Sequence, residues 1–168
     1  MHEEKIKMNT NNNEVLVNKK PHVSSVVVYP PMIYLGGLVL GLILDLLIPI
    51  RIESRVFFVP IGLIFLTIAT ILISWAQHTS RKFNKKDEKI SNDFYKGPYK
   101  FSRNPTYLGL TFLVIGFGFI INSLFVAIFT ILSFIITHFL FVRKEENILK
   151  EKYGEHYLEY KKSVRSWF

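Results

Sequence analysis

The sequence predicts an all-α integral membrane protein: a bundle of four transmembrane helices with a helical hairpin and a C-terminal interfacial helical segment. Its 168 residues contain three long apolar runs, at 32–50, 56–76 and 107–142. Runs of about 18 or more apolar residues are typical of membrane spans. Within these runs only Asp45 and His138 carry a carboxylate or an imidazole, and no Lys or Arg is present. The charges are therefore segregated from the apolar sequence.

The composition excludes several classes of protein. The chain has no cysteine, which excludes a disulfide framework, a thiolate zinc site and thiol catalysis. It has 21 Lys and Arg residues against 13 acids, and this surplus favours an anionic partner. Because the basic residues flank the apolar runs, we expect membrane lipids as partners and no nucleic acid.

The elements follow in order along the chain. Residues 1–31 are polar and Asn-rich, which predicts a loosely ordered cytosolic tail. The rest, 32–168, is predicted to form a single membrane-embedded domain. The run 107–142 is too long for one span of about 20 residues. The polar pair Asn122–Ser123 near its middle predicts a hairpin tip, so the predicted spans are about 32–50, 56–76, 105–121 and 124–142.

The basic residues predict the orientation of these spans. The tail holds four Lys or Arg residues, the 77–105 loop eight and the 143–168 segment seven, so 19 of the 21 lie on one side. The opposite loop holds only Arg51 and Arg55. The positive-inside rule then places both termini and the active site of this multi-pass protein on the cytosolic side.

Two features of the first span have more than one interpretation. Gly37 and Gly41 form a small-xxx-small pattern that allows close helix packing, within the chain or in a dimer. Asp45 lies near the outer end of the same span. An intramembrane carboxylate suggests function, although this depth also allows the side chain to reach the interface.

The segment 97–109 contains the start of the third span. Asn104–Pro105 predicts a helix N-terminus, because Asn suits the N-cap and Pro suits the first helical position. Arg103 then stands beside the positive end of the helix dipole. This arrangement suits a carboxylate or phosphate, and it is equally compatible with an ordinary cap beside a snorkelling arginine.

Acidic and aromatic residues follow the fourth span. Glu145 and Glu146 form either a solvated charge cluster or a site for a cationic ligand at the membrane boundary. His138 precedes Glu145 by two helical turns, which predicts the same helix face for both. Aromatic residues alternating with lysines then predict an interfacial anchor. These residues are Tyr153, Tyr157, Tyr160, Trp167 and Phe168.

Over residues 94–168 the sequence resembles a known family. The resemblance lies in Gly97-Pro98-Tyr99, Arg103-Asn104-Pro105-x-Tyr107-Leu108-Gly109, Glu145-Glu146-x-x-Leu149, Tyr153-Gly154-x-x-Tyr157-x-x-Tyr160 and Val164-Arg165-x-Trp167. These motifs resemble the isoprenylcysteine carboxyl methyltransferase family and the related membrane phospholipid N-methyltransferases. The resemblance implies an S-adenosylmethionine-dependent methyltransferase that binds its cofactor between membrane helices and transfers a methyl group to a lipophilic acceptor, a carboxylate.

The resemblance also implies site residues. Arg103 and Asn104 would be catalytic, and no metal ligand is implied. The cofactor-binding residues would be Phe94, Tyr99, Asn104, Pro105, Thr106, Tyr107, Glu145 and Glu146. The sequence departs from the carboxyl methyltransferases at Asn104, where they usually have His. Asn cannot carry a charge or a proton, which weakens the assignment to an isoprenylcysteine substrate.

Three alternatives remain open from the sequence. The acceptor is a phospholipid amine or another small hydrophobic metabolite, with the same cofactor. The chain is a nicotinamide-dependent relative of the membrane sterol reductases, whose larger helical core it lacks. The third alternative is a non-catalytic membrane protein that binds a partner.

Overall fold

The computed structural model describes residues 29–48, 50, 55–83 and 94–167. Within these ranges it contains helices and no strand, which confirms the predicted all-α class. The helices are α3 (Tyr29–Leu47), α4 (Arg55–Phe83), the 3₁₀ turn η1 (Gly97–Lys100), α5 (Pro105–Ile121), α6 (Leu124–Thr137), the π-helical turn η2 (His138–Val142), α7 (Arg143–Tyr153) and α8 (Glu155–Ser163). Most of the predicted tail and the connector 51–54 lie outside the described residues.

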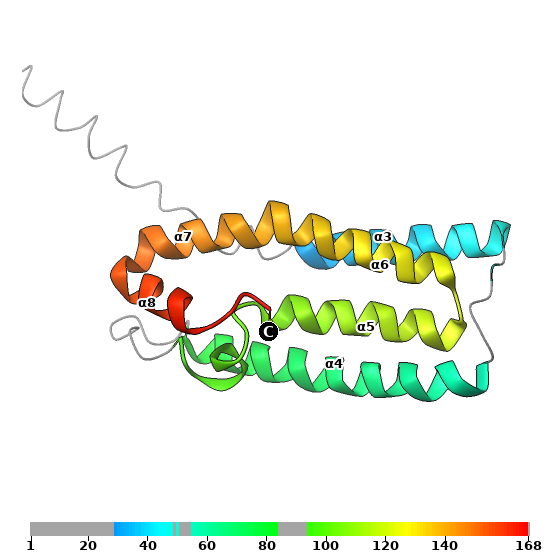
Figure 1. Cartoon of the computed structure of the whole chain (residues 1–168), viewed down its shortest axis with the longest axis horizontal. Coiled ribbons are helices and arrows are strands. Elements are labelled where there is room, and N and C mark those ends of the chain that lie inside the picture. The colour runs from blue at the N-terminus through cyan, green and yellow to red at the C-terminus, as the bar shows by residue number, and fades with distance from the viewer. Residues whose placement is uncertain (1–28, 49, 51–54, 84–93, 168) are drawn as a thin grey trace, which may run out of the picture.

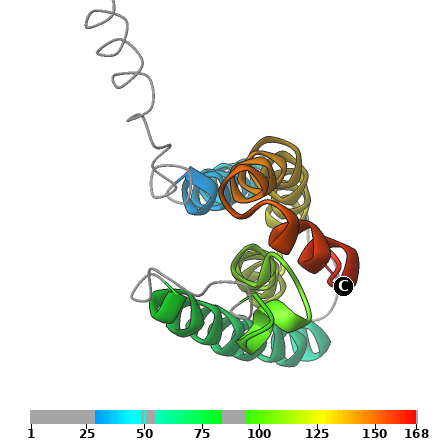
Figure 2. The same cartoon turned by 90° about the vertical axis from the view of Figure 1, so that its left-hand side faces the viewer.

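The long helices lie side by side (Figure 1). Helix α5 lies between α4 and α6, and α3 packs on α6. Seen along the bundle, the pair α3–α6 and the pair α4–α5 form two layers (Figure 2). Helices α7 and α8 and the start of α5 share one end of the bundle, which we call the basic end because Arg103, Arg143 and Lys161 lie there.

Three helices are long and apolar enough to cross a membrane: Pro30–Leu47, Val56–Arg81 and Leu124–Tyr153. Helix α5 is a shorter apolar helix that coincides with the predicted third span. The last of the three runs from α6 through η2 into α7 without a break. The charged residues of α7 and the apolar residues of α6 therefore belong to one continuous helix, which we call the long helix.

The hairpin between α5 and α6 turns at Asn122 and Ser123, as predicted. Asn122 ends α5 in the left-handed region, with φ 56°, a conformation that Asn tolerates better than most residues. Ser123 is the N-cap of α6, and its Oγ accepts a hydrogen bond from the Val126 N–H at 3.3 Å. Two residues therefore suffice to reverse the chain.

The small residues of α3 are used for packing within the chain. A Cβ on Gly37 would lie 2.5 Å from Ser133 Oγ, and a Cβ on Gly41 would lie 2.9 Å from Val126 Cα, both in α6. The pattern thus serves the α3–α6 contact, one of the two interpretations left open by the sequence. Asp45, one turn further along, is 9% exposed. Its carboxylate is therefore inside the bundle rather than at its surface.

Candidate active site

A tight turn brings the loop before α5 onto α4. Gly97 has φ +58°, a conformation that favours glycine, and a Cβ there would lie 2.4 Å from Thr79 Oγ1. Pro98 follows it as the second residue of η1 and is buried. The turn places Tyr99 in hydrogen-bonding contact with Thr106 of α5 and Ser80 of α4. Burial raises the pKa of Tyr99, and these two hydrogen bonds oppose that shift.

Tyr107 and Glu145 meet across the helical hairpin. The Tyr107 hydroxyl donates a hydrogen bond to Glu145 Oε1 at 2.5 Å. Tyr107 is 5% exposed, and Glu145 is partly buried in the first turn of α7. In the part of the chain that the structure describes, no Lys, Arg or His forms an ion pair with Glu145. Among the described residues, the Glu145 carboxylate is thus held by a neutral donor and has no basic partner.

Glu146, by contrast, joins two basic side chains. Its Oε1 lies 3.0 Å from Arg103 Nη1, and its Oε2 lies 2.6 Å from Lys161 Nζ. The Arg103 and Glu146 side chains are 10% and 12% exposed, whereas that of Lys161 is 45% exposed. Arg103 Nη1 is engaged in this ion pair, whereas Nε makes no hydrogen bond with any described residue. Among the described residues, the guanidinium therefore keeps one unused donor in a place that water barely reaches.

Phe94 belongs to an aromatic cluster with Tyr153, Tyr157 and Tyr160. Its ring centroid lies 5.2 Å from that of Tyr153, 5.7 Å from Tyr157 and 5.2 Å from Tyr160. The Tyr160 hydroxyl donates to the Tyr99 carbonyl oxygen at 2.7 Å, which links the cluster to η1. Burial raises the pKa of Tyr157 to about 12; the charge of Glu146 adds to this shift, and Arg103 opposes it. Tyr157 therefore stays neutral near pH 7.

Asn104 occupies the predicted N-cap position of α5, but its side chain does not cap the helix. Its Nδ2 donates instead to the carbonyl oxygen of Ser166 at 3.1 Å and to Ser166 Oγ at 3.0 Å. These two bonds fix the orientation of the amide, and its oxygen accepts no bond from the first turn of α5. Pro105, as predicted, is the first residue of the helix.

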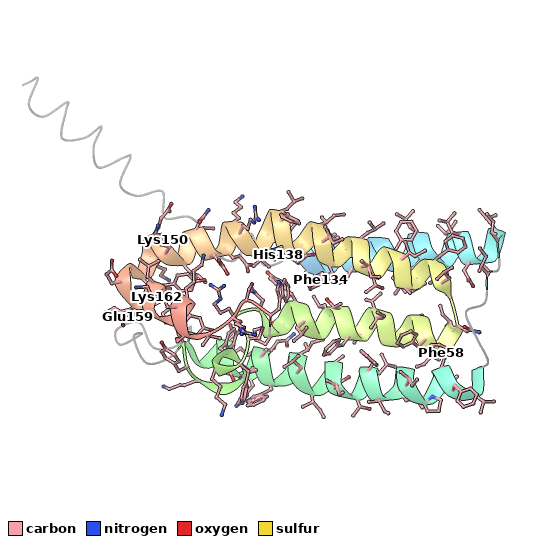
Figure 3. The ribbon with its side chains drawn as sticks, in the orientation of Figure 1. Phe58, Phe134, His138, Lys150, Glu159 and Lys162 are labelled. Carbon is pink, nitrogen blue, oxygen red and sulfur yellow. The ribbon has the colours of Figure 1, made fainter. Side chains whose placement is uncertain are left out.

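Ser166 stands only at the unspecified position of the Val164-Arg165-x-Trp167 motif, and it lies 62 residues from Asn104. Ser102 was also missed; its Oγ donates to the Ser166 carbonyl oxygen at 3.2 Å. Trp167 was expected as an interfacial anchor and as part of that motif. Its Nε1 donates to His138 Nδ1 at 3.2 Å, and its ring packs on Phe134 with centroids 4.5 Å apart. Figure 3 shows Phe134 and His138 on neighbouring turns of the long helix, near the start of α5.

The predicted site residues thus gather at the basic end. Tyr99, Thr106, Tyr107 and Glu145 form one group, and Arg103 and Glu146 form a second beside it. Phe94 and Asn104 adjoin these groups through the aromatic cluster and Ser166. Lys150, Glu159 and Lys162 lie further out along α7 and α8 and are exposed (Figure 3). Among the described residues, no three His, Asp or Glu side chains are grouped as metal ligands.

A family model described as Phospholipid methyltransferase matches residues 55–156. The match contains all the predicted site residues and ends before Ser166 and Trp167. No curated protein and no solved structure matches the chain significantly.

Proposed function

The chain belongs to the phospholipid methyltransferase family, and we propose that it uses S-adenosylmethionine to methylate a lipid amine drawn from the membrane. The family establishes a membrane methyltransferase, and its members generally use S-adenosylmethionine. The cofactor and the acceptor of this chain are parts of the proposal.

The proposal rests mainly on the surroundings of the Glu145 carboxylate. Its carboxylate is partly buried, is held by Tyr107 at 2.5 Å, and has no basic partner among the described residues. An uncompensated carboxylate in such a place favours a cationic ligand. S-adenosylmethionine carries a sulfonium and an ammonium group, so Glu145 fits it. The Nε donor of Arg103, which has no partner among the described residues, lies next to the start of α5 and fits the carboxylate of the same molecule.

The other predicted residues take supporting roles in this proposal. Tyr99 and Thr106 would line the cofactor site beside Tyr107, and Pro105 would fix the start of α5. Phe94 would support Tyr99 from behind through Tyr160. Glu146 would hold Arg103 in place by the ion pair at 3.0 Å. Arg103, assigned a catalytic role by resemblance, is proposed here to bind the cofactor.

When bound, the cofactor supplies an activated methyl group for in-line displacement. The protein would then position the acceptor and exclude water, without a nucleophile of its own. An ammonium acceptor would first have to release its proton so that the nitrogen lone pair could attack. A carboxylate acceptor would meet the like charge of Glu145, whereas an amine would not. A lipid amine is therefore the first candidate. Carboxyl O-methylation of a prenylated cysteine is the second, supported by the motifs of residues 97–109 and 145–160.

Transfer of a labelled methyl group tests both candidates in one assay. Protein in detergent or nanodiscs is given labelled S-adenosylmethionine with either phosphatidylethanolamine or a farnesylated cysteine analogue. We expect label in the lipid amine, stable to mild base. Label released by base as methanol would indicate a methyl ester. The proposed acceptor would then be a carboxylate instead of an amine. No transfer to either acceptor, together with no cofactor binding by calorimetry, would contradict the proposed function.

We also propose that the basic end faces the cytosol, since 19 of the 21 Lys and Arg residues flank the spans on that side. The chain has no cysteine, so a single cysteine reports its own side. In intact cells, Lys162→Cys on exposed α8 should resist a membrane-impermeant maleimide and react after permeabilisation. Equal labelling before and after permeabilisation would reverse the orientation.

A further inference from the structure

We propose that the last described residues, Val164–Trp167, form a C-terminal strap that positions the two halves of the methyltransferase site, with Ser166 and Trp167 as its positioning residues. One half is the start of α5, which carries Arg103 and Tyr107. The other is the long helix, which carries Glu145 and Glu146. The inference rests on the proposed function for its kinetic test, and it also predicts structural effects that do not depend on methyl transfer.

On the α5 side, the strap contacts three consecutive residues. The Arg103 N–H donates to the Arg165 carbonyl oxygen at 3.1 Å. Ser102 Oγ donates to the Ser166 carbonyl oxygen at 3.2 Å, and Asn104 Nδ2 donates to the same oxygen and to Ser166 Oγ. Ser102 and Asn104 are buried, 5% and 8% exposed. The backbone and side chain that precede Pro105 are therefore fixed by the strap.

On the other side, the strap contacts the long helix through Trp167. Its indole N–H donates to His138 Nδ1, and its ring packs on Phe134. His138 begins the π-helical turn η2, a local widening of the helix that often occurs at functional sites. Val164, the first residue of the strap, is buried against Tyr157 and Tyr160 of α8. Each residue of the strap therefore contacts another part of the protein.

These contacts give Asn104 a different role from the one predicted by resemblance. An amide group has two N–H donors, and both acceptors near Nδ2 belong to Ser166. We infer that Asn104 holds the start of α5 in place rather than touching the reacting atoms. Where the related carboxyl methyltransferases usually have His, this chain has a side chain whose donors match Ser166. The strap lies beyond residue 156, where the family match ends.

Positioning matters here because the Tyr107–Glu145 bond joins the two halves that the strap also joins. A hydrogen bond weakens steeply when its geometry is lost, so this bond depends on the positions of both helices. Loss of the Trp167–His138 bond would let the start of α5 move relative to α7. The expected result is weaker cofactor binding and slower transfer, with the fold intact.

The variants Trp167→Phe and His138→Leu test the strap in the full-length protein. Trp167→Phe keeps an aromatic ring on Phe134, and it removes the N–H donor together with part of the indole ring. We expect kcat/KM to fall about tenfold in either variant, and the double variant to be no worse than the poorer single one. The matched control is Trp75→Phe on α4, whose side chain is 44% exposed and which should keep wild-type kinetics.

Three measurements separate positioning from mere stabilisation. Melting temperatures in detergent should stay within a few degrees of wild type, whereas kcat/KM falls. Amide hydrogen exchange in the peptide Lys100–Leu108 should be faster in Trp167→Phe, because it includes the Arg103 N–H. Wild-type kcat/KM in both folded single variants would contradict the positioning role of the strap. Losses of kcat/KM that add up in the double variant would also contradict it.

The exchange measurement needs no cofactor, so it keeps the two proposals apart. If the wild-type protein neither binds S-adenosylmethionine nor transfers a methyl group, the proposed function fails. Faster exchange in Trp167→Phe would then still support the strap. Unchanged exchange in that variant would contradict the strap whatever the activity.

Discussion

Glu145→Gln should lower the affinity for S-adenosylmethionine about a hundredfold, because a charge-assisted contact contributes up to about 3 kcal/mol. The substitution keeps the length of the side chain and leaves an amide oxygen that accepts the Tyr107 hydrogen bond. It removes only the negative charge. Isothermal calorimetry on detergent-solubilised protein measures the affinity directly, and the labelled-methyl assay should show a parallel loss of kcat/KM.

Glu151→Gln is the matched control for this experiment. Glu151 lies on the same helix, α7, but is exposed and lies outside both site groups. Its replacement should leave the dissociation constant within about twofold of wild type, since an exposed charge contributes little. Wild-type affinity in Glu145→Gln would remove this residue from the cofactor site. A melting temperature far below that of Glu151→Gln would instead show a folding defect.

Gly41→Leu should prevent stable folding, because α3 and α6 touch at this position. A Cβ there would lie 2.9 Å from Val126 Cα and 3.0 Å from the Val126 backbone nitrogen, atoms that cannot rotate away. The helices would have to separate, which costs about 3 kcal/mol for overpacking and also loses the contacts between them. Reversible unfolding in mixed detergent measures the loss, and monodisperse protein should become scarce.

Gly36→Leu provides the comparison in the same helix. A Cβ on Gly36 meets nothing within 4 Å, and the residue is exposed. The same added side chain should therefore leave the free energy of unfolding nearly unchanged. Equal stability of the two variants would show that α3 does not pack on α6 through Gly41. Loss of a dimer with no loss of stability in Gly41→Leu would point to an interface between two copies.

Much of the fold follows from local sequence. The apolar runs and the Asn122–Ser123 pair predict the helices and the hairpin tip, because hydrophobicity and turn preference are properties of short segments. The continuation of α4 to Phe83 was not predicted, whereas the spacing of His138 and Glu145 already assumed a helix that runs past residue 142. Polar helix beyond a membrane boundary depends on packing against other segments, as does the π-helical turn at His138.

The candidate site, too, combines residues that local motifs predict with contacts that depend on distant segments. Motif resemblance brought together Tyr99, Tyr107 and Glu145, and the structure places these side chains in one group. Ser166 could not be found in this way, because its contacts with Ser102 and Asn104 join segments more than 60 residues apart. The N-cap preference of Asn describes an isolated helix end. It does not foresee that acceptors on a distant segment bind the amide nitrogen and fix the side chain in another orientation.

The hairpin of α5 and α6 has a consequence for assembly in the membrane. Tyr107 and Glu145 lie 38 residues apart, one on the first arm and the other on the extension of the second. The turn at Asn122 and Ser123 brings the arms together without any other helix. The central hydrogen bond of the site can therefore form as soon as this pair of helices has been inserted by the translocation machinery. The hydrogen bonds from Ser102, Arg103 and Asn104 to the strap form later, once residues 164–167 have been synthesised.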